Sequence, residues 1–337
     1  GPAIGRTAEL KAACNSVLDK LGATYEVYGG PGTCCGVLQF RPGDTENAGR
    51  QALTTIQRFH ETGASEVLAW CPTCQIQFGE IALPSVSPPG EPLFDINMFP
   101  VYMARRFDDM KRLMTRPVNK KVALFEFPGS RGVTEAVQKL LKAIPGLEFV
   151  DLEIDQAGYQ MSALETMPEY RETSIARVLT KAEAAGVTAL CSVFHADHRE
   201  ISSHEAAWPF EIVNYMDLIG ESMGIRRDDL FKRLKGMQDV DAIVADAADT
   251  IAEHGMSLDE ARDAVMNGDA DAAIIIPKGF KIDFSGLSKT PILVLVDPSN
   301  PIAGTMISKT LGLESPEEID AHPHGRIALG HVCRGPK

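Results

Sequence analysis

Hydrophobic positions along the first two thirds of the chain change between helical and strand-like spacing. Leu10, Cys14, Val17, Leu18 and Leu21 recur at helical spacing. Short runs rich in β-branched and aromatic residues, closed by Gly or Cys, are typical of strands. The elements predicted in this first stretch are a helix over residues 7–21, a strand over 24–28, a Gly-rich turn over 29–36, a helix over 45–62 and a strand over 66–70.

A second stretch repeats this order. Its predicted elements are a strand over residues 121–127, a helix over 133–144, a strand over 147–152, a helix over 173–185 and a strand over 187–190. Cys71 pairs with Cys191 along the repeat, and residues 92–107 and 209–223 extend both copies as an extended stretch followed by an amphipathic helix. This alternation predicts an α/β fold of two tandem, pseudo-symmetric repeats with largely parallel sheets. In such folds the loops at the carboxyl ends of the strands carry the sites.

The pattern changes after residue 226. Ser257-Leu258-Asp259-Glu260 has the spacing of a capping box at a helix start. The elements predicted there are helices over 228–234, 240–254 and 256–266 and strands over 272–277 and 292–296. We therefore expect three domains, which are a first repeat over 1–115, a second, degenerate repeat over 116–226, and a helical linker with a small α/β domain over 227–337.

The composition is that of a globular protein with an acid excess. Of the 337 residues, 44% are hydrophobic and 23% are charged, so the chain can bury a sizeable core. The formal net charge of −13 argues against a nucleic-acid backbone or an anionic membrane surface as the main partner. No apolar run approaches the roughly 20 residues that cross a bilayer, and the start does not resemble a signal peptide. We expect a soluble, cytoplasmic protein without a transmembrane segment.

Cysteines carry most of the chemical information. Four of the seven lie in two motifs, Cys34-Cys35-Gly36 and Cys71-Pro72-Thr73-Cys74. Clustered thiols in a reducing compartment more often bind a metal or do redox chemistry than form a disulfide framework. A Cys-x-x-Cys pair can place two thiolates on one metal, and four thiolates are the number that a [4Fe–4S] cluster requires. Tetrahedral zinc held by the same four cysteines is the alternative.

Residues 5–225 resemble the CCG-domain (cysteine-rich) iron–sulfur proteins, such as the cysteine-rich component of heterodisulfide reductase. The resemblance rests on the two cysteine motifs, on the spacing between them, and on the duplication, in which Pro128-Gly129-Ser130 replaces the family's Pro-Gly-Cys. It implies a fold of paired CCG-type repeats and a cluster that acts in thiol/disulfide or quinone-linked electron transfer. The cluster ligands that it implies are Cys34, Cys35, Cys71 and Cys74.

The sequence departs from the family pattern in two places. The family's first cysteine falls near Pro2 and Ala3, so this cysteine is either absent or lies upstream of Gly1. The remaining four thiolates favour an ordinary [4Fe–4S] centre over an unusual five-cysteine cluster. The second copy keeps only Cys191, which argues against a second cluster of the family type.

Candidate catalytic residues lie in the second copy, at Cys191, His195 and His198. A thiolate and imidazoles there would face the cluster across the repeat interface as proton donors or substrate contacts, because histidine titrates in the useful range. The alternative is a degenerate loop with solvated histidines. Cys14, on the apolar face of the first helix, is expected to be a buried small hydrophobic residue.

A last group of candidate ligands lies near the C-terminus. His322, His324, His331 and Cys333 have metal-compatible spacing, which would suit zinc or another metal. A closing tail with exposed polar residues explains the same pattern.

These residues and the resemblance predict an iron–sulfur oxidoreductase subunit, similar to heterodisulfide reductase. It would pass electrons through one cluster to or from a small thiol/disulfide or quinone-linked substrate. Gly29-Gly30-Pro31-Gly32 follows a predicted strand, but Cys34 and Cys35 occupy the place where a nucleotide-binding helix would open. Electrons would therefore come from a partner subunit, a flavoprotein or a ferredoxin-like protein. The alternatives are a non-catalytic electron-relay or assembly subunit and a zinc-stabilised binding protein.

Overall fold

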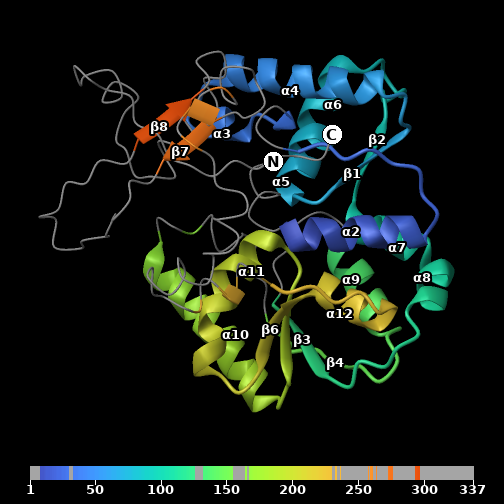
Figure 1. The fold of residues 1–337 in the computed structure, drawn as a ribbon, viewed down its shortest axis with the longest axis vertical. Helices are drawn as coiled ribbons and strands as arrows, with labels where there is room; N and C mark the ends of the chain where they lie inside the picture. The colour runs from blue at the N-terminus through green and yellow to red at the C-terminus, as the bar shows by residue number, and fades with distance from the viewer. Residues whose placement is uncertain are drawn as a thin grey trace, which may run out of the picture. The chain divides into compact units, whose positions relative to one another are not determined.

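The chain divides into two compact units, Gly1–Gly236 and Met237–Lys337. The computed structural model describes residues 8–29, 33–125, 132–154, 164, 167–229, 232–233, 236, 257, 259–260, 263, 272–275 and 293–296. The first unit contains two parallel sheets and the helices that cover them (Figure 1). This is the α/β fold predicted from the alternation of helices and strands. Every helix within these ranges is too short or too polar to cross a membrane.

The first repeat builds a two-stranded sheet. Its elements are α2 (Ala8–Lys20), α3 (Val37–Phe40), α4 (Thr45–Glu61), β1 (Glu66–Ala69), α5 (Pro72–Ile76), the π-helix η2 (Gln77–Ala82), α6 (Leu83–Val86), β2 (Asp95–Met98), α7 (Phe99–Arg105) and α8 (Phe107–Leu113). Strands β1 and β2 run parallel, with Glu66 opposite Asp95. The apolar face of α4 buries Ala48, Ala52 and Ile56, at the spacing of one helix face.

The strand predicted over residues 24–28 is wrong. The structure has irregular backbone there, and most of these side chains are exposed. An extended segment becomes a strand only when a neighbouring strand takes up its backbone hydrogen bonds. Tyr25 instead donates its hydroxyl to Asp19 at 2.9 Å, which holds the segment to the end of α2.

The second repeat builds a four-stranded sheet. Its elements are β3 (Lys121–Phe125), α9 (Val133–Leu141), β4 (Glu148–Val150), α10 (Pro168–Ala184), β5 (Ala189–Ser192), α11 (His195–Ile201), the 3₁₀ helix η4 (Ser202–Ala207), β6 (Glu211–Asn214) and α12 (Tyr215–Met223). The strand order is β4-β3-β5-β6, and every pair is parallel. Because β5 lies between two neighbours, all four of its residues are buried. The order of the strands reverses between β3 and β5, which is where sites form in such sheets.

The structure shifts the register of the repeat. Strand β1 followed by α5 corresponds to β5 followed by α11, and the N-cap residues of these helices are Cys71 and Phe194. Cys191 therefore corresponds to Leu68 inside β1. The alignment of the two repeats predicted from the sequence, which matched Cys191 to Cys71, is wrong by three residues. The predicted extended-then-helical segments are confirmed as β2–α7 and β6–α12.

Both repeats contribute to one hydrophobic core. It contains the fully buried Met103 of α7, Val137 of α9 and Ile219 of α12, together with residues of α2. At its edge Trp70 stacks on Tyr215, with ring centroids 5.7 Å apart and planes 15° apart. The stack joins the end of β1 to the start of α12.

The second unit is described at a few positions only. Strands β7 (Ala272–Ile275) and β8 (Leu293–Val296) pair antiparallel, where strands were predicted. Ser257 and Glu260 form the predicted capping box, since the Glu260 backbone N–H donates to Ser257 Oγ at 3.2 Å and the Ser257 N–H to Glu260 Oε2 at 2.8 Å. The helix predicted over 240–254 lies outside the described residues.

Candidate metal centre

The turn that carries Cys34 and Cys35 is packed tightly against α4. Gly36 has φ +77°, and a Cβ at this position would lie 2.3 Å from the backbone oxygen of Ala48. Only glycine fits, because it tolerates positive φ and leaves room for this approach. Thr55 of α4 donates its buried hydroxyl to the Cys34 carbonyl oxygen at 2.9 Å. The turn therefore has a fixed position before any ligand binds.

The second motif follows β1 directly and opens a helix. Cys71 is the N-cap residue of α5, and Pro72 occupies the first turn, where its missing N–H costs nothing. Cys74 lies in the same turn, so both thiols leave the backbone close together. Trp70, the residue just before Cys71, is held in place by stacking on Tyr215.

The fold brings all four cysteines of the two motifs together. The Cys35 side chain hydrogen-bonds to those of Cys34 and Cys74, and Cys74 also hydrogen-bonds to Cys71. We call this series Cys34–Cys35–Cys74–Cys71 the thiol chain. Cys34 and Cys35 are buried, whereas Cys71 and Cys74 are half-buried, and all four are free of disulfides. The side reached from solvent is therefore the Cys71 end.

The contacts divide the thiol chain into two acidic and two weakly acidic groups. Hydrogen bonds from Cys34 and then Cys74 lower the pKa of Cys35 to about 3. A hydrogen bond from Cys74 lowers the pKa of Cys71 to about 6. The backbone N–H groups of Thr73 and Cys74 near the Cys71 sulfur lower this pKa further, although no side-chain capping hydrogen bond forms. As hydrogen-bond donors, Cys34 and Cys74 have raised pKa values. Cys35 and Cys71 are thus the two thiols that ionise most readily, and the thiolate is the form that binds metal.

The donor set suits a thiophilic metal group. In the described part of the chain, no group of three or more His, Cys, Asp or Glu side chains is already arranged as a metal site. The sulfurs hydrogen-bond to one another instead, so a metal would replace these contacts with bonds to sulfur. Four sulfurs without oxygen ligands fit an iron–sulfur cluster or zinc and do not fit magnesium or calcium.

Cys191 lies in a different environment from the thiol chain. It is fully buried inside β5 and belongs to the hydrophobic core shared by the repeats. Burial raises its pKa well above the ordinary value, so the side chain is a neutral thiol. This position favours a packing role, and a catalytic role for Cys191 stays a prediction.

His195 begins α11 and is 5% exposed. Burial first, and then the charge of Arg199, lowers its pKa to about 3, so the imidazole is neutral. Among the described residues, the buried Nδ1 atom has no hydrogen-bond partner. A neutral buried imidazole with a free nitrogen can accept or donate a hydrogen bond. A catalytic role for His195 stays a prediction.

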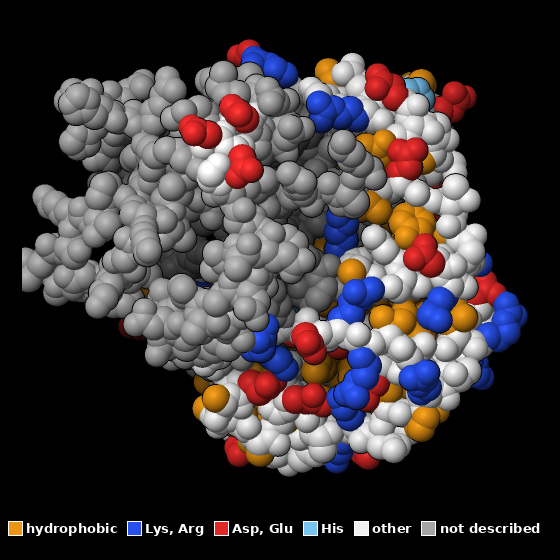
Figure 2. Space-filling view, viewed as in Figure 1, with side chains coloured by type: hydrophobic (Ala, Val, Ile, Leu, Met, Phe, Trp, Pro, Cys, Tyr) orange, Lys and Arg blue, Asp and Glu red, His pale blue; other side chains and the backbone are white. Residues whose placement is uncertain are grey.

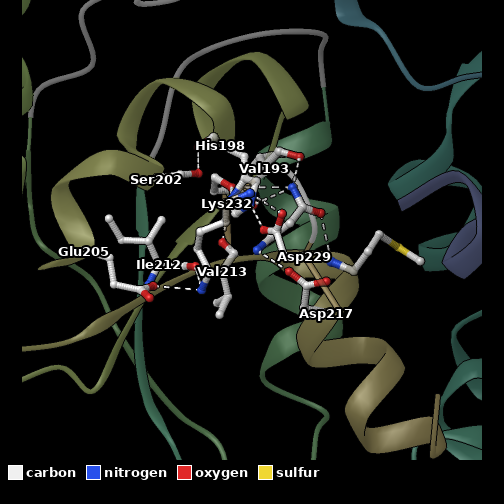
Figure 3. Close-up of polar contacts among 12 residues, drawn as sticks. Val193, His198, Ser202, Glu205, Ile212, Val213, Asp217, Asp229 and Lys232 are labelled. Carbon is white, nitrogen blue, oxygen red and sulfur yellow. Dashed lines mark hydrogen bonds and ion pairs between the residues drawn. The ribbon is translucent and has the colours of Figure 1, made fainter. Parts of the chain in front are cut away.

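His198 is at the centre of a buried polar network (Figure 3). Its Nδ1 lies 3.0 Å from Ser192 Oγ, and its Nε2 lies 2.5 Å from Asp229 Oδ2. The side chain is 1% exposed. The expectation of solvated histidines is therefore wrong for both His195 and His198, because the loop after β5 turns into a packed helix. The hydrogen bonds to Ser192 and Asp229 give His198 a structural role. A catalytic role for His198 stays a prediction.

The same network covers the edge of the four-stranded sheet. Lys232 Nζ donates to the Ile212 carbonyl oxygen at 3.0 Å and to Glu205 Oε2 at 2.8 Å. The Ile212 backbone N–H donates to the same Glu205 carboxylate at 2.5 Å. Burial would raise the pKa of Asp229, but the hydrogen bond and charge of His198 outweigh it and lower that pKa. Side chains thus take the place of a further strand beside β6.

Sequence reasoning missed the polar residues that hold these elements. Thr55 gave no signal because threonine is common on helix surfaces, and Asp229 and Lys232 lie in a segment without a recognisable motif. Gly36 was visible only as the third residue of the Cys-Cys-Gly motif. The predicted C-terminal ligands lie outside the described residues, at His322, His324, His331 and Cys333.

Comparison with known proteins identifies the cysteine-bearing segment. Residues 4–79 match the family model of the CCG cysteine-rich domain, and this stretch contains the whole thiol chain. The match is consistent with metal binding and with an iron–sulfur, redox-related function. The chain has no match among curated proteins.

On the face shown in Figure 2, acidic and basic side chains are interspersed over the described surface.

Proposed function

We propose that this chain is an iron–sulfur oxidoreductase subunit of the heterodisulfide-reductase type, with one [4Fe–4S] cluster on the thiol chain. The observation that carries the proposal is the series of contacts that links four thiols from two motifs within the segment that matches the CCG domain. Four sulfur ligands are the number that such a cluster needs. The cluster would supply one-electron transfer, while the protein supplies its position and electrostatic surroundings.

Each part of the site has a task in this proposal. Cys34 and Cys35 form the buried side of the ligand set, held by Thr55. Cys71 and Cys74 form the half-buried side, where a partner or substrate can approach. Electrons come from a flavoprotein or a ferredoxin-like partner and pass to a small thiol/disulfide or a quinone-linked acceptor. Cys191, His195 and His198 are the candidate proton donors or substrate contacts, and the neutral His195 imidazole can donate or accept a hydrogen bond there.

The test is anaerobic purification and reconstitution with iron and sulfide, followed by measurement of iron, acid-labile sulfide and zinc together. We expect about four irons and four sulfides per chain and a broad absorbance band at about 400 nm that bleaches on reduction. Cys34→Ser and Cys74→Ser should lose this signal. The control variant Cys14→Ala should keep it, because Cys14 lies in α2 outside the thiol chain.

One zinc per chain and no visible band, even after reconstitution, would contradict the proposal and leave a zinc-stabilised binding protein. A second measurement separates an enzyme from a relay. The reduced, loaded protein is mixed with a small disulfide or a quinone, and reoxidation is followed by absorbance. Reoxidation that depends on the acceptor supports catalysis, whereas reoxidation only by a protein partner indicates an electron relay.

A further inference from the structure

Cys74 occupies the middle of the thiol chain and has two cysteine partners. It packs against the buried cluster that contains Cys35, and it lies in the first turn of α5, the helix that Cys71 caps. Its side chain hydrogen-bonds to both cysteines. Two cysteines can form a disulfide only where the fold already brings their side chains together. The structure places two possible partners beside the Cys74 sulfur, one within the same helical turn and one from the other motif.

Access to the thiol chain comes from one end. Cys71 and Cys74 are half-buried, while Cys35 and Cys34 behind them are buried. The neighbouring thiol of Cys74 is already in contact with Cys71, so a molecule that reacts at Cys71 meets a second thiol at once. Such a neighbour acts at a very high effective concentration. This is the arrangement that an exchange reaction between a dithiol and an external disulfide requires.

From this geometry we propose that the chain, when no metal occupies the cysteines, carries out dithiol–disulfide exchange with small disulfides. Cys71 is the attacking thiol, Cys74 is the resolving thiol, and Cys35 is the second partner of Cys74. This activity belongs to the metal-free chain and does not rest on the identity of the metal group in the proposed function.

The exchange balances in two steps. The Cys71 sulfur attacks one sulfur of a disulfide R–S–S–R, which forms a mixed disulfide on Cys71 and releases one R–SH. The Cys74 sulfur then attacks the Cys71 sulfur, forms the Cys71–Cys74 bond and releases the second R–SH. Two electrons and two protons leave the protein dithiol and reduce one external disulfide to two thiols. Attack of Cys35 on Cys74 can then release Cys71 and move the bond inward.

Oxidation and metal loading exclude each other in this scheme. A sulfur in a disulfide has no thiolate to offer, and Cys74 takes part in either bond. The oxidised chain would therefore lose two of its four sulfur donors. Reduction of the disulfide restores the thiol chain and its capacity for metal.

The test uses the full-length chain, freed of metal by a chelator, reduced, and then mixed anaerobically with oxidised glutathione. We expect two molecules of glutathione to be released per chain and an intramolecular disulfide that contains Cys74. Cys74→Ser should stop at glutathione bound to Cys71, and this mixed disulfide should last at least ~100-fold longer than in the unchanged chain. The Cys14→Ala control should react like the unchanged chain.

Peptide mapping of the unchanged chain decides the matter even if Cys74→Ser fails to fold. A stable mixed disulfide on the unchanged chain, or an internal disulfide without Cys74, overturns the proposal. Prompt release of glutathione by a folded Cys74→Ser variant overturns it as well. Failure to bind iron in the reconstitution experiment contradicts the proposed function alone, so the two tests fail separately.

Discussion

At the scale of single residues, the cysteine site depends on side chains without redox chemistry of their own. Gly36 lets the Cys-Cys-Gly turn approach the backbone of α4, and Thr55 fixes the Cys34 carbonyl. Both act before a ligand is present, because they set where the sulfur atoms of the first motif can lie. Preformed positions of this kind reduce the ordering that ligand binding would otherwise require.

Replacing Gly36 with alanine should destabilise the chain more than the same change at Gly90. Both residues have positive φ, +77° and +80°, but a Cβ at Gly36 meets Ala48 O at 2.3 Å while Gly90 has open space. Gly36→Ala adds overpacking of about 1–3 kcal/mol to the conformational strain that both variants share. Urea unfolding of the metal-free, reduced proteins measures the difference. Equal losses in the two variants would contradict the packing explanation.

The buried imidazole of His195 should make the chain sensitive to acid. Its pKa is lowered from 6.5 to about 3 by burial. Below about pH 6.5 the imidazole is therefore protonated in the unfolded chain but stays neutral in the folded chain. The free energy of unfolding is highest above that pH and falls as the pH drops toward 3.

The measurement is the free energy of unfolding between pH 7 and pH 4. His195→Leu should show a shallower acid-side slope than the unchanged chain, because this proton-binding difference is removed. His60→Leu, at an exposed position on α4, is the control and should keep the slope. An unchanged slope in His195→Leu would show that other groups cause the acid sensitivity.

At the scale of elements, the edge strand β6 depends on side chains from the segment that follows α12. Lys232 and Glu205 satisfy the backbone groups of Ile212, and Asp229 binds His198 of α11. An open strand edge can pair with another chain, so this cover also blocks unwanted association. Asp229 and Lys232 of this segment thus pack against the second repeat, within the same compact unit.

Replacement of Asp229 with asparagine should destabilise the second repeat by about 1–3 kcal/mol at neutral pH, since a charge-assisted hydrogen bond is lost from a buried imidazole. The pKa of Asp229 is lowered in the fold. Its contribution is therefore complete above its ordinary pKa and disappears as the pH falls through the folded value.

Hydrogen exchange at β6 and chemical unfolding at several pH values measure this effect. The difference between Asp229→Asn and the unchanged chain should shrink in acid. Asp228→Asn, at the exposed neighbouring position, is the control and should match the unchanged chain. A pH-independent difference would mean that the aspartate charge contributes nothing.

At the scale of the whole molecule, the first compact unit contains the thiol chain together with the hydrophobic clusters described above. Among the residues that the structure describes, the members of the hydrophobic clusters belong to that unit, and so does the thiol chain. The Trp70–Tyr215 stack joins the cysteine repeat to the second repeat. The two repeats should therefore unfold together.

A chain that ends at residue 236 should fold by itself and keep the thiol chain. We expect one cooperative unfolding transition, because both repeats share a core. Its loading with iron and sulfide, or with zinc, should equal that of the full-length protein measured in parallel. Two separate transitions, or a loss of metal loading on truncation, would contradict this expectation.

The class of fold, the order of most elements and the cysteine motifs could be predicted from the amino-acid sequence. These features are local: periodicity marks helices and strands, and Cys-x-x-Cys with Cys-Cys-Gly marks the sulfur chemistry. The error at residues 24–28 arose because a strand depends on a partner that composition cannot show. The repeat register was three residues out, since sequence spacing does not reveal where a strand ends.

Which side chains contact one another became apparent from the packing of the folded chain. It placed Cys74 between Cys35 and Cys71, buried His195 and His198, and brought Asp229 to an imidazole of a distant helix. Contacts between residues far apart in the chain depend on how helices and sheets pack, and packing is a property of the whole core. The chemistry of the thiols was legible in the sequence, but their order of contact and their access to solvent belong to the fold.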